Sequence, residues 1–157
     1  MSTNSRIAVM HGTVCKSVYC HWDGYLAHNG VILQEHYDSS KANHLVALGD
    51  LSSLKATIGE KHAFSQFEVP KEEVDEFLAL TENMCTFYGR DRGEKHTEHK
   101  VAQTFEDFLE QCNHCGAEYY YIMENGQWYY GSMHERDPFY KRLVLLSEAL
   151  ATEAVEA

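Results

Sequence analysis

The chain has 157 residues, 44% of them hydrophobic, and its 13 basic and 24 acidic side chains give a formal charge of −11. This composition predicts one acidic globular domain and excludes a disordered chain or multidomain machinery. No long apolar run or basic leader is present, which predicts a cytoplasmic protein, and the negative charge disfavours direct binding to nucleic-acid phosphates.

The first third of the chain alternates strand-like and helix-like patterns. Residues 6–10 and 14–22 are β-branched runs separated by a Gly-containing turn, which predicts an N-terminal hairpin. Apolar residues then recur at spacings of three and four over 31–37 and 41–48. We expect two short helices there, with Ser39-Ser40 as the cap between them.

The middle of the chain carries two helix signals with a strand between them. Pro70 at a first helical position predicts an acidic helical segment that ends near Leu80. Residues 84–88 then resemble a strand. Thr104 is a suitable cap for a helix whose first turn is acidic, and Gly116 ends the apolar stripe of that helix.

A second hairpin is the clearest local signal. Residues 117–123 and 128–131 flank a loop centred on Asn125-Gly126, a pair that favours a type I′ turn. In the register set by that turn, Met123 faces Trp128. The hairpin should therefore bring many aromatic side chains onto two adjacent strands.

The final segment and the overall architecture follow from these elements. Asp137-Pro138 predicts the start of a last helix, which would bury Tyr140, Leu143, Val144 and Leu150. We expect an α+β fold in one domain, with a mainly antiparallel sheet, hairpins at 6–22 and 117–131, and covering helices. The termini, about residues 1–5 and 152–157, should fray.

Four segments of the sequence resemble a family of small bacteriophage proteins. They cover most of the chain up to about Gly131 and include the distinctive His-Trp-Asp-Gly-Tyr string. The segments are Arg6-Ile7-Ala8-Val9, Ser17 to Tyr25, Phe87 to Glu94, and Cys115-Gly116-Ala117-Glu118-Tyr119 through Tyr130. The resemblance implies a phage accessory protein that acts in the cytoplasm of the infected bacterium.

Two cysteines have the spacing of a metal motif. Cys112 and Cys115 are separated by two residues, so both thiolates could reach one zinc ion. A structural zinc site needs two more ligands, and no second pair of this spacing exists. The alternative is that both are buried free thiols, and we expect no cofactor.

Catalytic signals are few. Cys20 and His21 are adjacent, but they would point to opposite faces of a strand and so form no dyad. His21 and Asp23 remain acid and base candidates for an enzyme acting on a small ligand. No familiar catalytic motif is present, and we expect a protein without enzymatic activity.

Polar and aromatic residues at two strand ends suggest a ligand site. If the ends converge, the arginines could hold a phosphate or carboxylate while an aromatic ring stacks on a base or sugar. The site residues would be Trp22, Tyr25, Tyr88, Arg90 and Arg92. The alternative is a structural network in which the arginines pair with nearby carboxylates and Trp22 belongs to the core.

Two surfaces are candidates for binding a protein. The aromatic hairpin could present Tyr120 or Tyr129 to a partner, unless helices cover both of its faces. Acidic side chains on helix faces could instead bind a basic surface, or could simply keep the chain soluble. The acidic candidates are Glu72, Glu73, Asp75 and Glu76.

The leading hypothesis is a phage accessory protein that binds and modulates a host protein, such as a defence or nucleic-acid-handling enzyme, through acidic and aromatic surfaces. The alternative is a small-molecule binding protein or sponge for a nucleotide-like ligand. The sequence identifies neither the host target nor the oligomeric state.

Overall fold

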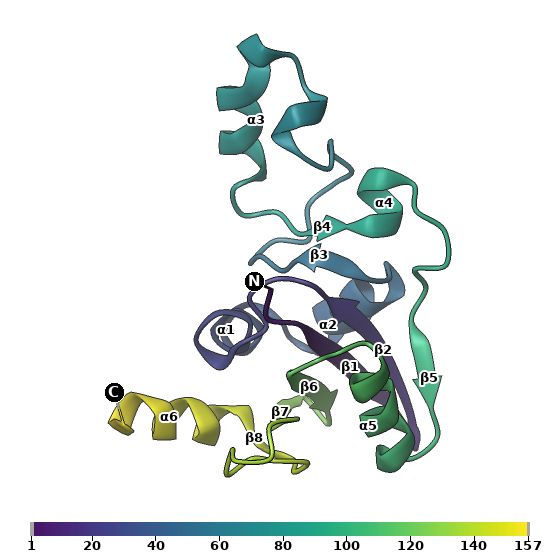
Figure 1. The fold of residues 1–157 in the computed structure, drawn as a ribbon, viewed down its shortest axis with the longest axis vertical. Coiled ribbons are helices and arrows are strands. Elements are labelled where there is room, and N and C mark those ends of the chain that lie inside the picture. Colours follow the sequence, from purple (N-terminus) through teal and green to yellow (C-terminus); the bar gives the residue numbers. More distant parts are fainter. Residues whose placement is uncertain (1, 157) are drawn as a thin grey trace.

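One eight-stranded sheet organises the computed structural model, which describes residues 2–156. The strand order is β4-β3-β2-β1-β6-β7-β8, and β5 pairs with β2 beside this path (Figure 1). The strands are β1 (Ser5–His11), β2 (Val14–Cys20), β3 (Leu51–Ser53), β4 (Thr86–Phe87), β5 (Lys100–Ala102), β6 (Tyr119–Glu124), β7 (Gln127–Ser132) and β8 (Val144–Leu145). The expected α+β class is confirmed.

The two predicted hairpins form the centre of the sheet. β1 and β2 are antiparallel, and so are β6 and β7, in which Met123 faces Trp128 as expected. The turn residues Asn125 and Gly126 have φ values of 53° and 78°, the left-handed conformation that a type I′ turn requires. The hairpins join through a parallel pairing of β1 with β6.

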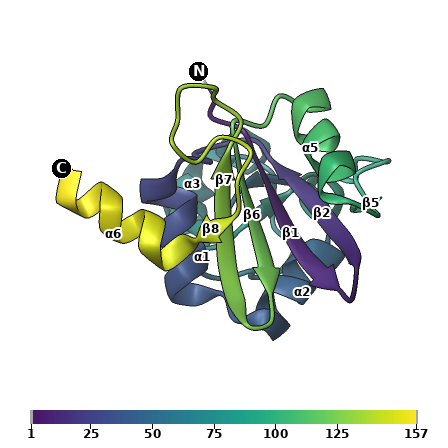
Figure 2. The ribbon, with the colours of Figure 1, turned by 90° about the horizontal axis from the view of Figure 1, so that it is seen from below.

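Helices cover both faces of the sheet (Figure 2). On one face, α1, α2 and α6 contribute buried residues such as Leu33, Leu45 and Leu146 to the larger core. On the other face, α5 contributes Phe108 and Cys112 to a second core. The longer helices are α1 (Val31–His36), α2 (Ser39–Ala47), α3 (Val74–Thr81), α5 (Phe105–His114) and α6 (Leu146–Glu156), with the short α4 (Tyr88–Arg92) after β4.

The caps explain where two of these helices begin. The Thr104 hydroxyl accepts a hydrogen bond from the Asp107 amide at 3.0 Å, so the predicted cap of α5 is confirmed. In α2 the cap is Asp38, whose Oδ1 accepts from the Lys41 amide at 2.8 Å. The prediction of Ser39-Ser40 as the cap was wrong by one residue, because a carboxylate stands immediately before these serines.

The predicted helix from Asp137-Pro138 is wrong. The Asp137 carboxylate accepts from the Phe139 amide at 2.8 Å in a local turn, and Lys141 has a φ of 50°, which breaks any helix at that point. The chain then adds β8 to the edge of β7, and α6 starts only at Leu146.

Regular secondary structure lies close to both ends of the described residues. β1 already begins at Ser5, whose side chain is fully buried, and α6 runs through Glu156. Residues 1 and 157 lie outside the described part. No helix within residues 2–156 is long and apolar enough to cross a membrane.

Raising the pH through the range above 10 is expected to unfold the protein, because burial raises the pKa of several tyrosines above the ordinary value of about 10. The pKa of Tyr19 rises to about 12, and those of Tyr37, Tyr121 and Tyr130 also increase. The unfolded chain releases these protons first, so stability is complete below about pH 10 and falls as the pH rises through the folded-state values. Phenolate absorbance should therefore increase together with the loss of tertiary circular dichroism.

Candidate interaction site on a projecting acidic arm

Residues 58–83, here called the α3 arm, extend beyond the sheet between β3 and β4 (Figure 1, top). Backbone hydrogen bonds close the base of the arm. The Thr57 amide donates to Asn83 O, and the Cys85 amide donates to Thr57 O, each at 2.9 Å. The arm is therefore a loop with its own helix whose two ends are fastened at one point of the sheet edge.

Local sequence accounts for the helix in the arm. Pro70 precedes a short 3₁₀ turn over Lys71–Glu73, and α3 follows directly. Acidic side chains in the first turns interact favourably with the positive end of the helix dipole. Val74, Phe77 and Thr81 are half-buried and share one face, but none of the α3 residues is fully buried. The helix thus has little core of its own.

Apolar side chains on the arm are unusually exposed. The exposed fractions are 87% for Phe67, 63% for Leu80 and 46% for Leu78. Single exposed apolar residues are common, and here three of them lie on one small projection.

The same arm is strongly acidic. It carries seven acidic side chains and two lysines, a formal charge of −5 within a chain whose total is −11. The four predicted interface carboxylates, Glu72, Glu73, Asp75 and Glu76, are all exposed. The acidic residues of the arm are Glu60, Glu68, Glu72, Glu73, Asp75, Glu76 and Glu82. The α3 arm therefore combines negative charge with exposed apolar side chains.

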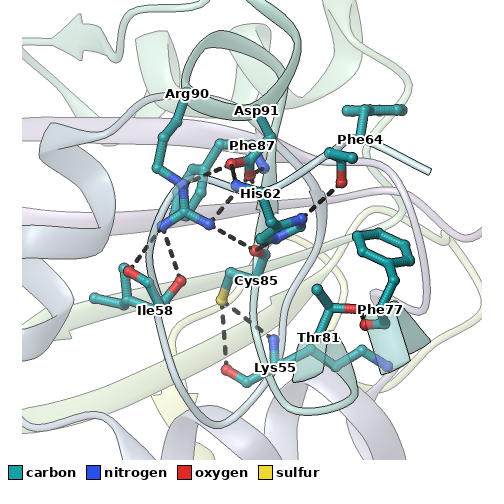
Figure 3. A network of polar contacts seen from close by, with 12 residues as sticks. Lys55, Ile58, His62, Phe64, Phe77, Thr81, Cys85, Phe87, Arg90 and Asp91 are labelled. Atoms are coloured by element: carbon teal, nitrogen blue, oxygen red, sulfur yellow. Dashed lines mark hydrogen bonds and ion pairs between the residues drawn. The ribbon is translucent and has the colours of Figure 1, made fainter. Parts of the chain in front are cut away.

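A guanidinium holds the base of the arm in place (Figure 3). Arg90 donates to the carbonyl oxygens of Ile58 and Gly59 at 2.9 and 3.0 Å, and to Cys85 O at 2.9 Å. It also makes a two-pronged ion pair with Asp91 at 2.9 and 3.1 Å. These five contacts use all five guanidinium donors. Arg90 thus connects the first residues of the arm to the segment that follows it.

Asp91 and His62 complete this network (Figure 3). The buried Asp91 carboxylate accepts from the amides of Phe87 and His62 at 2.8 and 3.1 Å. The His62 ring lies 3.0 Å from Cys85 O through Nε2, and its centroid is 6.2 Å from that of Phe77 on α3. The network therefore extends from the sheet edge to the inner face of α3.

This network corrects the assignment of Arg90 to a ligand site, since no donor of its guanidinium remains for a ligand. Arg92 is different: it is exposed and pairs with Glu94 at 2.6 Å. Its guanidinium lies over the rings of Phe64 and Tyr88, at 4.3 and 5.0 Å from their centroids. The pairing of these arginines with nearby carboxylates, which was the structural alternative, is thus observed for Arg90 with Asp91 and for Arg92 with Glu94.

The two segments of the predicted ligand site both border β3. The Trp22 amide donates to Ser52 O at 3.0 Å, and the Tyr88 amide donates to Asp50 O at 3.2 Å. Trp22 and Tyr25 are exposed, so the placement of Trp22 in the core is not observed. Tyr25 and the adjacent Leu26 line a hollow of about 220 Å³ whose other walls come from β6, β7, α6 and the turn over residues 137–139. Of the proposed ligand-site residues, only Tyr25 lines this particular hollow.

The weak catalytic and metal candidates show no assembled site. His21 Nδ1 lies 2.7 Å from the Tyr19 hydroxyl, and within residues 2–156 no ion pair joins His21 to Asp23. Cys112 is buried and Cys115 half-buried. The same residues contain no group of three or more His, Cys, Asp or Glu arranged to hold a metal ion.

The interface role of Tyr120 is wrong. Its side chain is fully buried beneath Phe105 and Phe108 of α5, with ring centroids 6.0 and 5.6 Å away. Tyr129 is half-buried. Helices cover both faces of the aromatic hairpin, which was the structural alternative for it.

Sequence reasoning missed the exposed apolar side chains of the arm and the polar network of Arg90, Asp91 and His62 at its base. Phe67 could have been noticed as an aromatic residue within a polar stretch, whereas nothing in the sequence marks His62 as a network residue.

Comparison with protein-family models, curated proteins and solved structures finds no match to this chain.

Proposed function

We propose that this protein is a phage accessory protein without enzymatic activity that binds a host protein through the α3 arm and thereby modulates or inhibits it. The observation that carries the proposal is the arm itself: a fastened projection with a charge of −5 and three exposed apolar side chains. The resemblance to small phage proteins supplies the host context.

The chemistry of the arm indicates the kind of partner. Its carboxylates would face a basic surface, and Phe67 and Leu80 would enter a shallow apolar hollow on that surface. Basic surfaces are characteristic of enzymes that handle nucleic acids, including defence enzymes. Because exposed charges attract over a Debye length, association should slow as salt concentration rises.

The direct test is a charge reversal on the arm. The triple variant Glu72→Lys, Asp75→Lys and Glu76→Lys should bind the host partner about a hundredfold more weakly, or worse, because like charges would then face each other. All three side chains are exposed, so the variant should fold, with only a modest loss of stability from placing positive charges at the start of α3. Affinity capture from host lysate, with and without nuclease, identifies the partner, and titration with that purified partner measures the loss.

A matched control lies on α5. Glu106→Lys, Asp107→Lys and Glu110→Lys change the net charge by the same amount on another exposed helix face. This variant should retain the partner at moderate salt. Equal binding by both triple variants and the wild type would refute the acidic-arm proposal, and equal loss by both would reduce it to a nonspecific charge effect.

The apolar contribution is tested by Phe67→Ala combined with Leu80→Ala. Both side chains are more than half exposed, so this variant should fold with nearly unchanged stability while it binds the partner at least about tenfold more weakly. Unchanged affinity would leave charge as the sole source of binding and would contradict the predicted apolar contacts.

A further inference from the structure

Arg6 carries a buried positive charge with an unusual set of partners. Its side chain is 1% exposed on β1, between the sheet and the end of α5. Nε and Nη2 donate to the hydroxyl and carbonyl of Ser17 at 2.9 and 3.0 Å, and Nη1 lies 3.7 Å from Cys115 Sγ. Within residues 2–156, no carboxylate lies within ion-pair distance of Arg6. Among the described residues, the Cys115 thiol is the ionisable group within hydrogen-bonding distance of this guanidinium, whose charge also acts on Cys15 and Cys112.

Cys115 differs from the other cysteines in accessibility. It is half-buried and borders a surface hollow together with Lys100 and His114. The other four thiols are buried, and burial raises their pKa, that of Cys15 to about 11 and that of Cys20 to about 12. At neutral pH those four stay protonated and shielded, so an electrophile from solvent should reach Cys115 first.

The second thiol of a redox pair stands one helical turn earlier. Cys112 lies three residues before Cys115, and ideal helix geometry places such Cα atoms about 5 Å apart, within the range that a disulfide spans. The Cys115 thiol lies 3.5 Å from the Cys112 carbonyl, at the last turn of α5. To form a disulfide, the Cys115 side chain must leave the hydrogen bond that its thiol donates to this carbonyl and turn toward Cys112.

We propose that Cys115 and Cys112 form an oxidation site for hydroperoxides, with Cys115 as the attacking thiol beside Arg6 and Cys112 as the resolving thiol. The Cys115 thiolate attacks one peroxide oxygen, the O–O bond breaks, and the leaving oxygen takes up a proton as an alcohol or as water. Cys115 is thereby oxidised to a sulfenic acid and the peroxide is reduced. The Arg6 guanidinium, whose Nη1 lies 3.7 Å from Cys115 Sγ, faces the sulfur at which this step takes place.

The second step closes the disulfide. The Cys112 sulfur attacks the sulfur of the Cys115 sulfenic acid, and hydroxide leaves with the proton of Cys112 as water. Two thiols and one hydroperoxide thus give one disulfide, one water and one alcohol, or a second water from hydrogen peroxide. A zinc site at the same two cysteines would need two further ligands, whereas the oxidation site needs only Cys112, Cys115 and Arg6.

The test uses the reduced full-length protein and hydrogen peroxide. Peptide mapping should find a Cys112–Cys115 disulfide, with a mass lower by about 2 Da, before any other cysteine is modified. Iodoacetamide should alkylate Cys115 about tenfold faster than any other thiol of the folded protein. These measurements need no variant, so they remain decisive even if a substitution impairs folding. Faster modification of another cysteine would overturn the proposal.

Variants separate the roles of the three residues. Cys112→Ser should leave a sulfenic acid on Cys115 that dimedone traps, and Cys115→Ser should abolish both the adduct and the disulfide. Arg6→Gln should slow alkylation of Cys115 at least about threefold, whereas Arg6→Lys keeps the charge and should slow it less. Oxidation of Cys115 to sulfinic acid without any disulfide in the wild type would contradict the assignment of Cys112 as the resolving thiol.

Discussion

Arg90→Ala is expected to destabilise the protein by about 3–5 kcal/mol, because truncation leaves the buried Asp91 carboxylate without its cation. The same change frees three carbonyl oxygens, those of Ile58, Gly59 and Cys85, from their donor. Since these carbonyls lie at the start of the α3 arm and just beyond its end, the arm should lose its fixed position as well. Chemical denaturation followed by fluorescence measures the first effect, and the rate of proteolysis within residues 58–83 measures the second.

Arg92→Ala provides the matched comparison, two residues further along the chain. Its ion pair with Glu94 is about half exposed on both sides, and such pairs contribute about 0–1 kcal/mol. Its stacking on Phe64 and Tyr88 adds a modest cation–π contribution. We therefore expect a loss far smaller than that of Arg90→Ala. Equal losses for the two arginines would contradict the assignment of Arg90 as the anchor.

Gly131→Ala is expected to cost about 3 kcal/mol or more, through a clash rather than through backbone conformation. A methyl group at this position of β7 would overlap the Tyr120 hydroxyl and the carbonyl oxygen of Arg142. These two atoms form a hydrogen bond that crosses directly over Gly131. Because Arg142 O is backbone and Tyr120 is fully buried, neither can move aside cheaply. Thermal unfolding measures the loss.

A double-mutant cycle gives the control for this prediction. Tyr120→Phe removes the hydroxyl and should cost about 1 kcal/mol by itself, for one hydrogen bond. In the Gly131→Ala background the same change also relieves part of the clash, so the two losses should combine to less than their sum. Strict additivity, or a stability of Gly131→Ala close to that of the wild type, would show that no such close approach exists.

Sequence patterns predicted the fold best where one local interaction decides the conformation. Asn125-Gly126 fixed the second hairpin and its register, and Thr104 capped α5. The pattern failed at Asp137-Pro138, where a good helix start is followed by Lys141 in a left-handed conformation. There the stabilisation from pairing β8 with β7, together with the hydrogen bond from Tyr120 to Arg142 O, outweighs the helix propensity of the local sequence. Both β7 and Tyr120 lie before this segment in the chain.

The candidate site was predictable only in part, for a related reason. The charge of residues 72–76 is visible in the sequence, and its exposure follows from the position of α3 beyond the sheet. The role of Arg90 depends on carbonyl oxygens about thirty residues away, at Ile58 and Gly59. Backbone acceptors have no sequence signature, so an anchoring arginine and a ligand-binding arginine look alike until the fold is known.

The parallel pairing of β1 with β6 has a consequence for how the chain reaches its native state. Ser5 pairs with Tyr119, so these two adjacent strands come from distant parts of the chain. Such distant contacts require a long loop to close first, which slows folding. During synthesis, the β1 edge of the first hairpin stays unpaired until β6 has left the ribosome. The exposed edge of β1 is then open to other strands, which makes the nascent chain the form most prone to aggregation.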